Sequence, residues 1–194
     1  MRLFVALDID DAVRNRIVRF LDGVREFAPD ARWARSESLH VTLKFIGEKP
    51  EEEVDKIRHG LETIAAESFE MKFCGYGFFP SVRSPRVFWI GIECGSALSS
   101  LAALVDDRLA ALDIPKEEHA FTPHLTLARG GGSGSPRVQK ADRPNRKFQH
   151  LQEKLAALPA PEFGTMTVRK FFLYQSKLSS DGSKYTKLAE FHLR

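Results

Sequence analysis

Apolar and polar residues alternate along parts of this chain and recur at helical spacing along others. Residues 2–8 predict a strand. Asp10 follows as a helix N-cap, ahead of apolar side chains spaced three or four apart. These apolar positions are Val13, Ile17, Phe20, Leu21 and Val24. The chain therefore opens with a strand and an amphipathic helix over residues 11–27.

The rest of the pattern predicts more strands than helices. Pro50 opens a helix whose first turn carries three glutamates, which suits a helix N-terminus. Gly47 ends the strand before it, and Ser179-Ser180-Asp181-Gly182 predicts a hairpin turn near the end. The expected strands cover 31–35, 39–46, 69–78, 86–93, 123–129, 163–175 and 184–193. The expected helices cover 50–66, 96–112 and 148–158. This alternation, closed by a hairpin, predicts an α+β fold with mixed sheets.

Two of the predicted strands begin with the same pattern, histidine, apolar, threonine, apolar. These are His40-Val41-Thr42-Leu43 and His124-Leu125-Thr126-Leu127. Successive strand side chains point to opposite faces, so each histidine shares a face with its threonine. Two such strands predict a cleft lined by two histidines and two threonines. The alternative is two ordinary core strands, each with one hydrogen-bonded histidine at its edge.

Paired histidines suit phosphoester cleavage. Histidine titrates near neutrality, so one ring takes a proton from the attacking oxygen while the other gives one to the leaving oxygen. Thr42 and Thr126 then donate to phosphate oxygens or position their histidines. Arg129 ends the second motif strand, where it can neutralise the negative charge that develops on the phosphate.

Phe45 holds the position in the first motif strand that Arg129 holds in the second. As a site residue Phe45 stacks on a nucleobase. Strict alternation puts both residues on the face opposite the histidines, so a β-bulge or the strand end must redirect them. The alternatives are a core phenylalanine and a solvated arginine.

The two motifs lie 84 residues apart, and the same offset aligns other segments. It places Leu3-Phe4-Val5-Ala6 on Val87-Phe88-Trp89-Ile90, and the first helical stripe on a second one within 97–105. We therefore expect one domain over 1–194, internally duplicated with approximate halves 1–84 and 85–194. A pseudo-twofold relation between the halves brings the motif strands together.

Composition narrows the class of protein. The 194 residues carry a formal net charge of +3, which permits a phosphate-bearing partner without requiring one. Cys74 and Cys94 form neither a disulfide framework nor a metal-site spacing. The N-terminal apolar run is too short for a signal peptide, and no segment approaches membrane-span length. These features predict a soluble cytoplasmic protein without a membrane partner.

The sequence lacks the motifs of metal-dependent, serine-nucleophile and nucleotide-binding sites. No carboxylate lies within the two histidine motifs to complete a metal site, so no metal and no cofactor is expected. The sequence has no Gly-x-Ser-x-Gly element, no P-loop and no dinucleotide-binding fingerprint. The four remaining histidines have no motif context. They are His59, His119, His150 and His192.

With its paired motifs, the chain resembles the 2H phosphoesterase superfamily, and its wider context resembles the RNA 2′,3′-cyclic phosphodiesterases, historically called 2′-5′ RNA ligases. Three further segments and the C-terminal region carry the resemblance. They are Arg2 to Leu7, Ser38 to Glu48, Thr122 to Arg129, and Gly182 to Leu188. The loop over 130–147 departs from the family pattern by its length and glycine content.

The resemblance implies a bilobal α+β fold, with two pseudo-twofold-related sheet lobes flanked by helices around a central cleft. It implies metal-independent hydrolysis of an RNA terminal 2′,3′-cyclic phosphate to a 2′-phosphate, with weak reversible 2′-5′ joining, by a monomer. By family analogy His40 is the acid for the departing 3′ oxygen and His124 the base for water. Thr42, Thr126 and Arg129 hold the phosphate.

Two alternatives differ from this function. One is a cyclic phosphodiesterase for small nucleotides or ADP-ribose-derived cyclic phosphates. The other is an RNA- or nucleotide-binding module without turnover, against which both intact histidines argue. The loop from Gly130 to Lys147 has five basic residues and one acidic residue, so it predicts either a basic flap that binds the RNA backbone or a solvated insertion.

Overall fold

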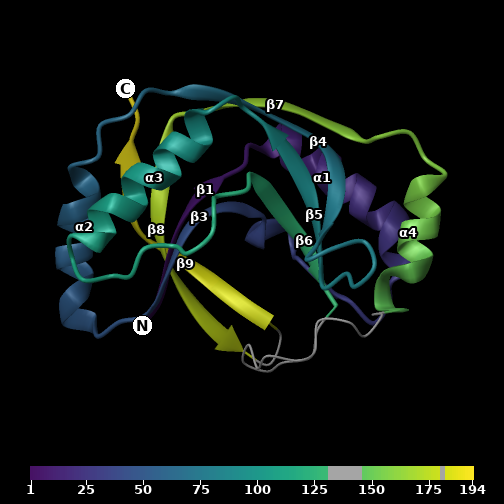
Figure 1. Cartoon of the computed structure of the whole chain (residues 1–194), viewed down its shortest axis with the longest axis horizontal. Helices are drawn as coiled ribbons and strands as arrows, with labels where there is room; N and C mark the ends of the chain where they lie inside the picture. The colour runs from purple at the N-terminus through teal and green to yellow at the C-terminus, as the bar shows by residue number, and fades with distance from the viewer. Residues whose placement is uncertain (131–145, 180–181) are drawn as a thin grey trace.

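The computed structural model describes residues 1–130, 146–179 and 182–194, and in them two antiparallel sheets lie between two pairs of helices (Figure 1). The first sheet has the order β3-β1-β8-β9. Its strands are β3 (His40–Glu48), β1 (Arg2–Asp8), β8 (Lys170–Ser179) and β9 (Gly182–His192). The second sheet has the order β2-β6-β5-β4-β7. Its strands are β2 (Arg32–Trp33), β6 (His124–Arg129), β5 (Val87–Glu93), β4 (Phe69–Phe79) and β7 (Glu162–Val168).

Two helices pack against the sheet that does not contain the strand before them. Helix α1 (Asp11–Val24) follows β1 but packs against β7 of the second sheet, near α4 (Gln149–Ala156). Helix α3 (Ala97–Ala110) follows β5 but packs against β3 of the first sheet, beside α2 (Val54–Glu62). Figure 1 shows the pair α2 and α3 at one end of the molecule and the pair α1 and α4 at the other. The predicted α+β class, with two sheets flanked by helices, is confirmed. The expected mixed sheets are wrong, because all strand pairings among the described residues are antiparallel.

Both sheets and the helices share one hydrophobic core. One cluster of buried side chains runs from Leu3, Val5 and Leu7 of β1 through both sheets to the helices. The opposite face of β1 carries a second, smaller cluster of Phe4 and Ala6 with aromatic side chains of β8. Strand β1 therefore has an aliphatic face toward the main core and an aromatic face toward the motif histidine of β3.

Most element boundaries follow the sequence pattern. The Asp10 side chain accepts a hydrogen bond from the Val13 backbone N–H at 2.8 Å, so the predicted N-cap of α1 is confirmed. The last predicted turn of that helix is a 3-10 turn, η1 (Arg25–Phe27). Short 3-10 turns also precede other elements. They are η2 (Ser36–Ser38), η3 (Glu51–Glu53) and η4 (Arg146–Phe148).

Three boundaries were wrong. The strand expected over 163–175 is two strands, because the chain leaves the second sheet after Val168 and enters the first at Lys170. The helix expected to reach residue 66 ends at Glu62, since residues 66 and 68 form backbone hydrogen bonds with Arg194 instead. Gly47 does not end β3; it adopts φ +88° inside the strand, which continues to Glu48.

The loop assigned to 130–147 falls largely on residues 131–145, outside the described residues, so its basic-flap interpretation stays a prediction. In the described ranges no helix is long and apolar enough to cross a membrane.

Candidate active site

The two motif strands lie next to each other where the sheets meet. Strand β3 is the edge of the first sheet, and it contacts β6 of the second. Each strand starts at its motif histidine, His40 or His124. The fold thus brings two segments 84 residues apart in sequence to one junction between the sheets.

A β-bulge redirects Phe45 onto the face of His40. Val5 and Ala6 of β1 pair with Lys44 and Thr42, so Leu43 is the extra residue of β3. Beyond this bulge the side-chain alternation is reversed. Phe45 pairs with Phe4, on the face of β1 that also carries the partner of His40. The Phe4 ring lies 5.0 Å from the His40 ring and 6.2 Å from that of Phe45, centroid to centroid.

A matching bulge redirects Arg129. Phe88 and Trp89 of β5 pair with Ala128 and Thr126, so Leu127 is the extra residue of β6. Arg129 consequently follows His124 and Thr126 onto one face. Leu43 and Leu127 occupy equivalent positions of the two motifs, so the same irregularity recurs at the same place in both halves.

The registers also correct the alignment of the halves. Asp8 pairs with His40, and Gly91 pairs with His124. The strands β1 and β5 are therefore related by 83 residues, whereas the motif strands are related by 84. The offset applied to Leu3-Phe4-Val5-Ala6 was wrong by one position. The internal duplication stays a prediction, which the matched bulges favour.

Both histidines are oriented by the same contact. Nδ1 of His40 donates to the carbonyl of Ser38 at 2.6 Å, and Nδ1 of His124 donates to the carbonyl of Thr122 at 2.7 Å. A carbonyl only accepts, so the proton of each neutral ring is on Nδ1. Nε2 is then the nitrogen that exchanges a proton with a substrate. Neither Ser38 nor Thr122 was a sequence-predicted site residue, although each lies two positions before its histidine.

The electrostatic surroundings of the two rings differ. Burial lowers the pKa of both histidines, and the Arg129 guanidinium lowers each of them further. The charge of one arginine therefore influences both rings. The Asp8 carboxylate raises the pKa of His40, whereas the paired position beside His124 is Gly91, which has no charge.

Aromatic side chains flank both rings. Tyr185 contacts His40 at 5.1 Å between centroids. Phe79 and Trp89 contact His124 at 5.0 and 6.3 Å. Thr42 and Thr126 are half-buried, and Phe45 is 55% exposed. These positions leave a stacking surface at Phe45 and hydroxyl donors beside each imidazole.

A cavity of about 610 Å³ opens beside His40. Its walls come from β1, α1, η2, β3, β8 and β9, and they include Asp8, Tyr174 and Lys187. His124 does not line it, nor do the other predicted site residues. The sequence pattern did not identify Asp8, Tyr174 and Lys187 as neighbours, because Asp8 is far from the other two in the chain.

Positive charge gathers around Arg129. Arg32 pairs with it across β2 and β6. Desolvation lowers the pKa of the Arg129 guanidinium, and the charges of Arg32 and Arg2 lower it further, so the three arginines lie near one another. Such a cluster attracts phosphate groups. Within the described chain no group of three His, Cys, Asp or Glu side chains is arranged to hold a metal ion.

Comparison with known proteins finds a match along most of the chain. The family model described as LigT-like phosphoesterase matches residues 7–89 and 91–185. An RNA 2′,3′-cyclic phosphodiesterase of Archaeoglobus fulgidus is 34% identical, over 98% of this chain and 99% of that protein. The protein of the same name from Aquifex aeolicus is 35% identical, over 84% and 81%.

Solved structures agree with this match. One from Thermus thermophilus has a TM-score of 0.75 at 30% identity, covering 100% of this chain and 98% of that one. A crystal structure of E. coli LigT complexed with 3′-AMP has a TM-score of 0.77 at 25% identity, covering 99% and 97%. The likeness therefore extends over the whole fold.

Proposed function

The chain belongs to the LigT-like phosphoesterase family, and from that premise we propose that it hydrolyses terminal 2′,3′-cyclic phosphates of RNA. Full-length relatives share this activity in their names, and the LigT structure with 3′-AMP shows a nucleotide on a related protein. The observation that carries the proposal for this chain is the matched pair of motif histidines. Each has its Nδ1 held by a carbonyl, and both are within the influence of Arg129.

In the proposed reaction, water attacks the phosphorus and the P–O3′ bond breaks. His124 Nε2 takes the proton from water, and His40 Nε2 gives a proton to the departing 3′ oxygen. The product keeps a 2′-phosphate. Thr42, Thr126 and Arg129 stabilise the phosphate oxygens, whose negative charge increases in the transition state. No step requires a metal ion.

The arginine cluster supports RNA as the substrate rather than a free nucleotide. Arg2 and Arg32 add positive charge near Arg129, and such charge attracts the phosphates of an oligonucleotide backbone. Phe45 offers an exposed ring for a base. A cyclic mononucleotide uses the histidines but gains nothing from distant cations.

The test compares an oligonucleotide ending in a 2′,3′-cyclic phosphate with a cyclic mononucleotide, both in excess EDTA. We expect a 2′-phosphate product in each case and a higher kcat/KM for the oligonucleotide. Equal kcat/KM values would favour the small-nucleotide activity, and binding without turnover would favour the binding module. Loss of turnover in EDTA, restored by a divalent ion, would contradict metal-independent chemistry. The monomeric state and cytoplasmic location stay predictions.

A further inference from the structure

One carboxylate distinguishes the surroundings of the two motif histidines. Asp8 is the last residue of β1 and pairs with His40 across the ladder. Directly paired residues project from the same face of a sheet, so the carboxylate and the imidazole share a face. At the equivalent place in the other half, the partner of His124 is Gly91. In the described part of the chain, the strand partner of His40 therefore carries a negative charge and that of His124 carries none.

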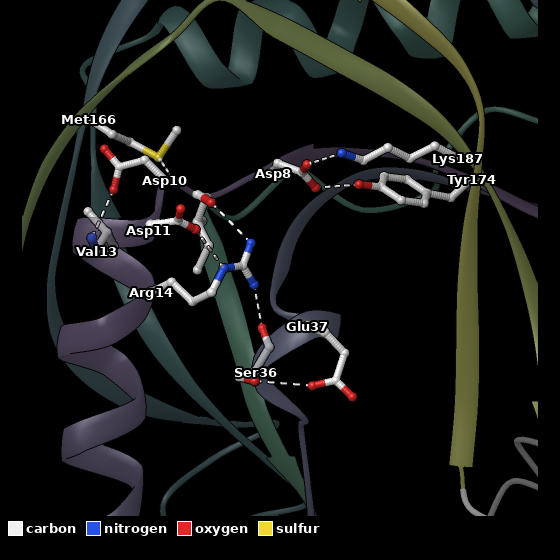
Figure 2. Close-up of polar contacts among 11 residues, drawn as sticks. Asp8, Asp10, Asp11, Val13, Arg14, Ser36, Glu37, Met166, Tyr174 and Lys187 are labelled. Carbon is white, nitrogen blue, oxygen red and sulfur yellow. Dashed lines mark hydrogen bonds and ion pairs between the residues drawn. The ribbon is translucent and has the colours of Figure 1, made fainter.

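Two side chains from the C-terminal hairpin hold this carboxylate in place. The Tyr174 hydroxyl donates to Oδ1 of Asp8, and the Lys187 ammonium donates to Oδ2 (Figure 2). Tyr174 comes from β8 and Lys187 from β9, so three strands of the first sheet converge on Asp8. Lys187 also lies over the Phe172 ring at 4.3 Å, which limits its movement.

The contacts of Asp8 suit a carboxylate that accepts hydrogen bonds. It accepts from both donors, as a carboxylate does. Its neighbourhood also raises the pKa of the Tyr174 hydroxyl, first by burial and then through the hydrogen bond and charge of Asp8. Tyr174 therefore stays a neutral donor. A third of the Asp8 side chain is exposed to solvent at the cavity beside His40, which lowers the desolvation cost of the charged form.

Charged and titratable groups surround the same ring and cavity. They are Arg14 of α1, Glu37 of η2, Arg129 of β6, Tyr185 of β9, and Asp8, Tyr174 and Lys187 already described. Glu37 is exposed and accepts a hydrogen bond from Ser36. Arg14 donates to the carbonyls of Ile9 and Ser36. Asp8 is thus the carboxylate in this group that faces His40 across the ladder.

We propose that Asp8, held by Tyr174 and Lys187, is a positioning residue that favours the protonated form of His40 and so makes it the proton donor of the pair. Among the described residues the strand partner of His124 is the uncharged Gly91, so His124 is the member of the pair that accepts a proton from water. The asymmetry between two nearly identical motifs then follows from Asp8 in one half and Gly91 in the other. This inference rests on the proposed function for its catalytic consequence, but its electrostatic part stands without substrate.

The sign of each neighbouring charge determines the direction in which the His40 pKa shifts. Burial lowers the pKa of His40, and Arg129 lowers it as well, whereas Asp8 raises it. Asp8→Asn removes the negative charge, so the His40 pKa falls. Lys187→Gln removes the cation that screens Asp8, so the His40 pKa rises. A purely structural role predicts no such opposite shifts.

The experiment measures the His40 and His124 pKa values by NMR titration of the imidazole signals in the free protein. Three variants are compared with the parent protein: Asp8→Asn, Lys187→Gln and the control Asp22→Asn. The Asp22 carboxylate lies in the last turn of α1 and pairs with Arg25. We expect opposite shifts of the His40 pKa in the first two and no shift in the control. No variant should shift His124 as much as His40.

The second readout is the pH profile of kcat/KM on a cyclic nucleotide. Asp8→Asn should lower kcat/KM about 3- to 30-fold near neutrality, because it removes part of a general-acid contribution of about 10² to 10⁴. The alkaline limb, set by the acid, should move to lower pH in Asp8→Asn and to higher pH in Lys187→Gln. Movement of the acidic limb instead would make His40 the base and overturn the assignment.

The failures are distinguishable. An unchanged His40 pKa in both variants refutes the role of Asp8 whether or not the protein hydrolyses anything. Opposite pKa shifts with no turnover on any cyclic phosphate leave Asp8 as the residue that sets the His40 charge and refute the proposed function. If Asp8→Asn does not fold, Tyr174→Phe takes its place: it removes a hydrogen bond to Asp8 without removing a charge, so the His40 pKa should rise, and an unchanged His40 pKa in this variant refutes the role of Asp8.

Discussion

Replacing Arg129 separates the two effects of its charge. The β-bulge at Leu127 places Arg129 on the histidine face, and its guanidinium lowers the pKa of both motif histidines in addition to the larger effect of burial. Arg129→Gln removes the charge and the paired donors. Arg129→Lys keeps the charge but loses the planar fork. The two variants should therefore differ in both rate and pH dependence.

The magnitude follows from the contacts that a guanidinium makes with a phosphate. Two parallel charge-assisted hydrogen bonds are available to Arg129, and removal of one preorganised donor typically costs a factor of about 10² to 10³ in kcat. Arg129 as a whole residue is exposed although its guanidinium is partly desolvated, so water replaces part of each contact and the lower end applies. We expect a loss of about 100-fold in Arg129→Gln and about tenfold in Arg129→Lys.

The pH profile gives the second result. Loss of the positive charge raises the pKa of both histidines, so the whole bell-shaped profile of Arg129→Gln should move to higher pH. Arg129→Lys should keep the parent profile. The assay is the initial rate of cyclic phosphate hydrolysis between about pH 5 and 9, the range in which histidine titrates. A rate within about threefold of the parent, together with an unmoved profile in Arg129→Gln, would refute the placement of Arg129 at the site.

The remaining predictions concern the stacking surface, the packing beside the site and the pH dependence of stability. Phe45→Ala should raise KM for an oligonucleotide about 5- to 100-fold by loss of base stacking and leave the melting temperature nearly unchanged, because this ring is 55% exposed. Gly77→Ala should lower the free energy of unfolding by about 1–3 kcal/mol in urea, since an added Cβ would lie 2.2 Å from the Trp89 ring; Gly23→Ala, with nothing within 4 Å, is the control and should not destabilise. Burial lowers the pKa of both motif histidines below the ordinary 6.5, so the unfolded chain binds more protons and stability should fall as pH drops through 6.5. Replacement of both histidines by Ala should flatten that slope, and an unchanged slope would contradict the lowered pKa values.

Local periodicity predicted the motif faces because a strand alternates strictly between two faces. It also showed that Phe45 and Arg129 needed a bulge to reach the histidines. The position of each bulge was not predictable, since Leu43 and Leu127 become the extra residues only through pairing with β1 and β5. A pattern read along one strand carries no information about the register of its neighbour.

Long-range pairing explains the other omissions. Asp8 and Tyr174 are 166 positions apart, and only the β1–β8 pairing brings them together. The division of the strand at Arg169 was hidden for the same reason, because both pieces are extended whichever sheet they join. The sequence thus predicted which strand faces carry the motif side chains, and the fold showed that Asp8 pairs with His40 whereas Gly91 pairs with His124.

The central claim is that His40 and His124 act as one acid–base pair on a cyclic phosphate. The most direct measurement is the kcat of His40→Ala, His124→Ala and the double variant on an oligonucleotide ending in a 2′,3′-cyclic phosphate, with folding checked by circular dichroism. Each single variant should lose a factor of about 10² to 10⁴, and the double variant should be little worse than either, because the pair acts as a unit. If either single variant keeps more than about a tenth of the parent rate, that histidine does not transfer a proton in the reaction, and the account is contradicted.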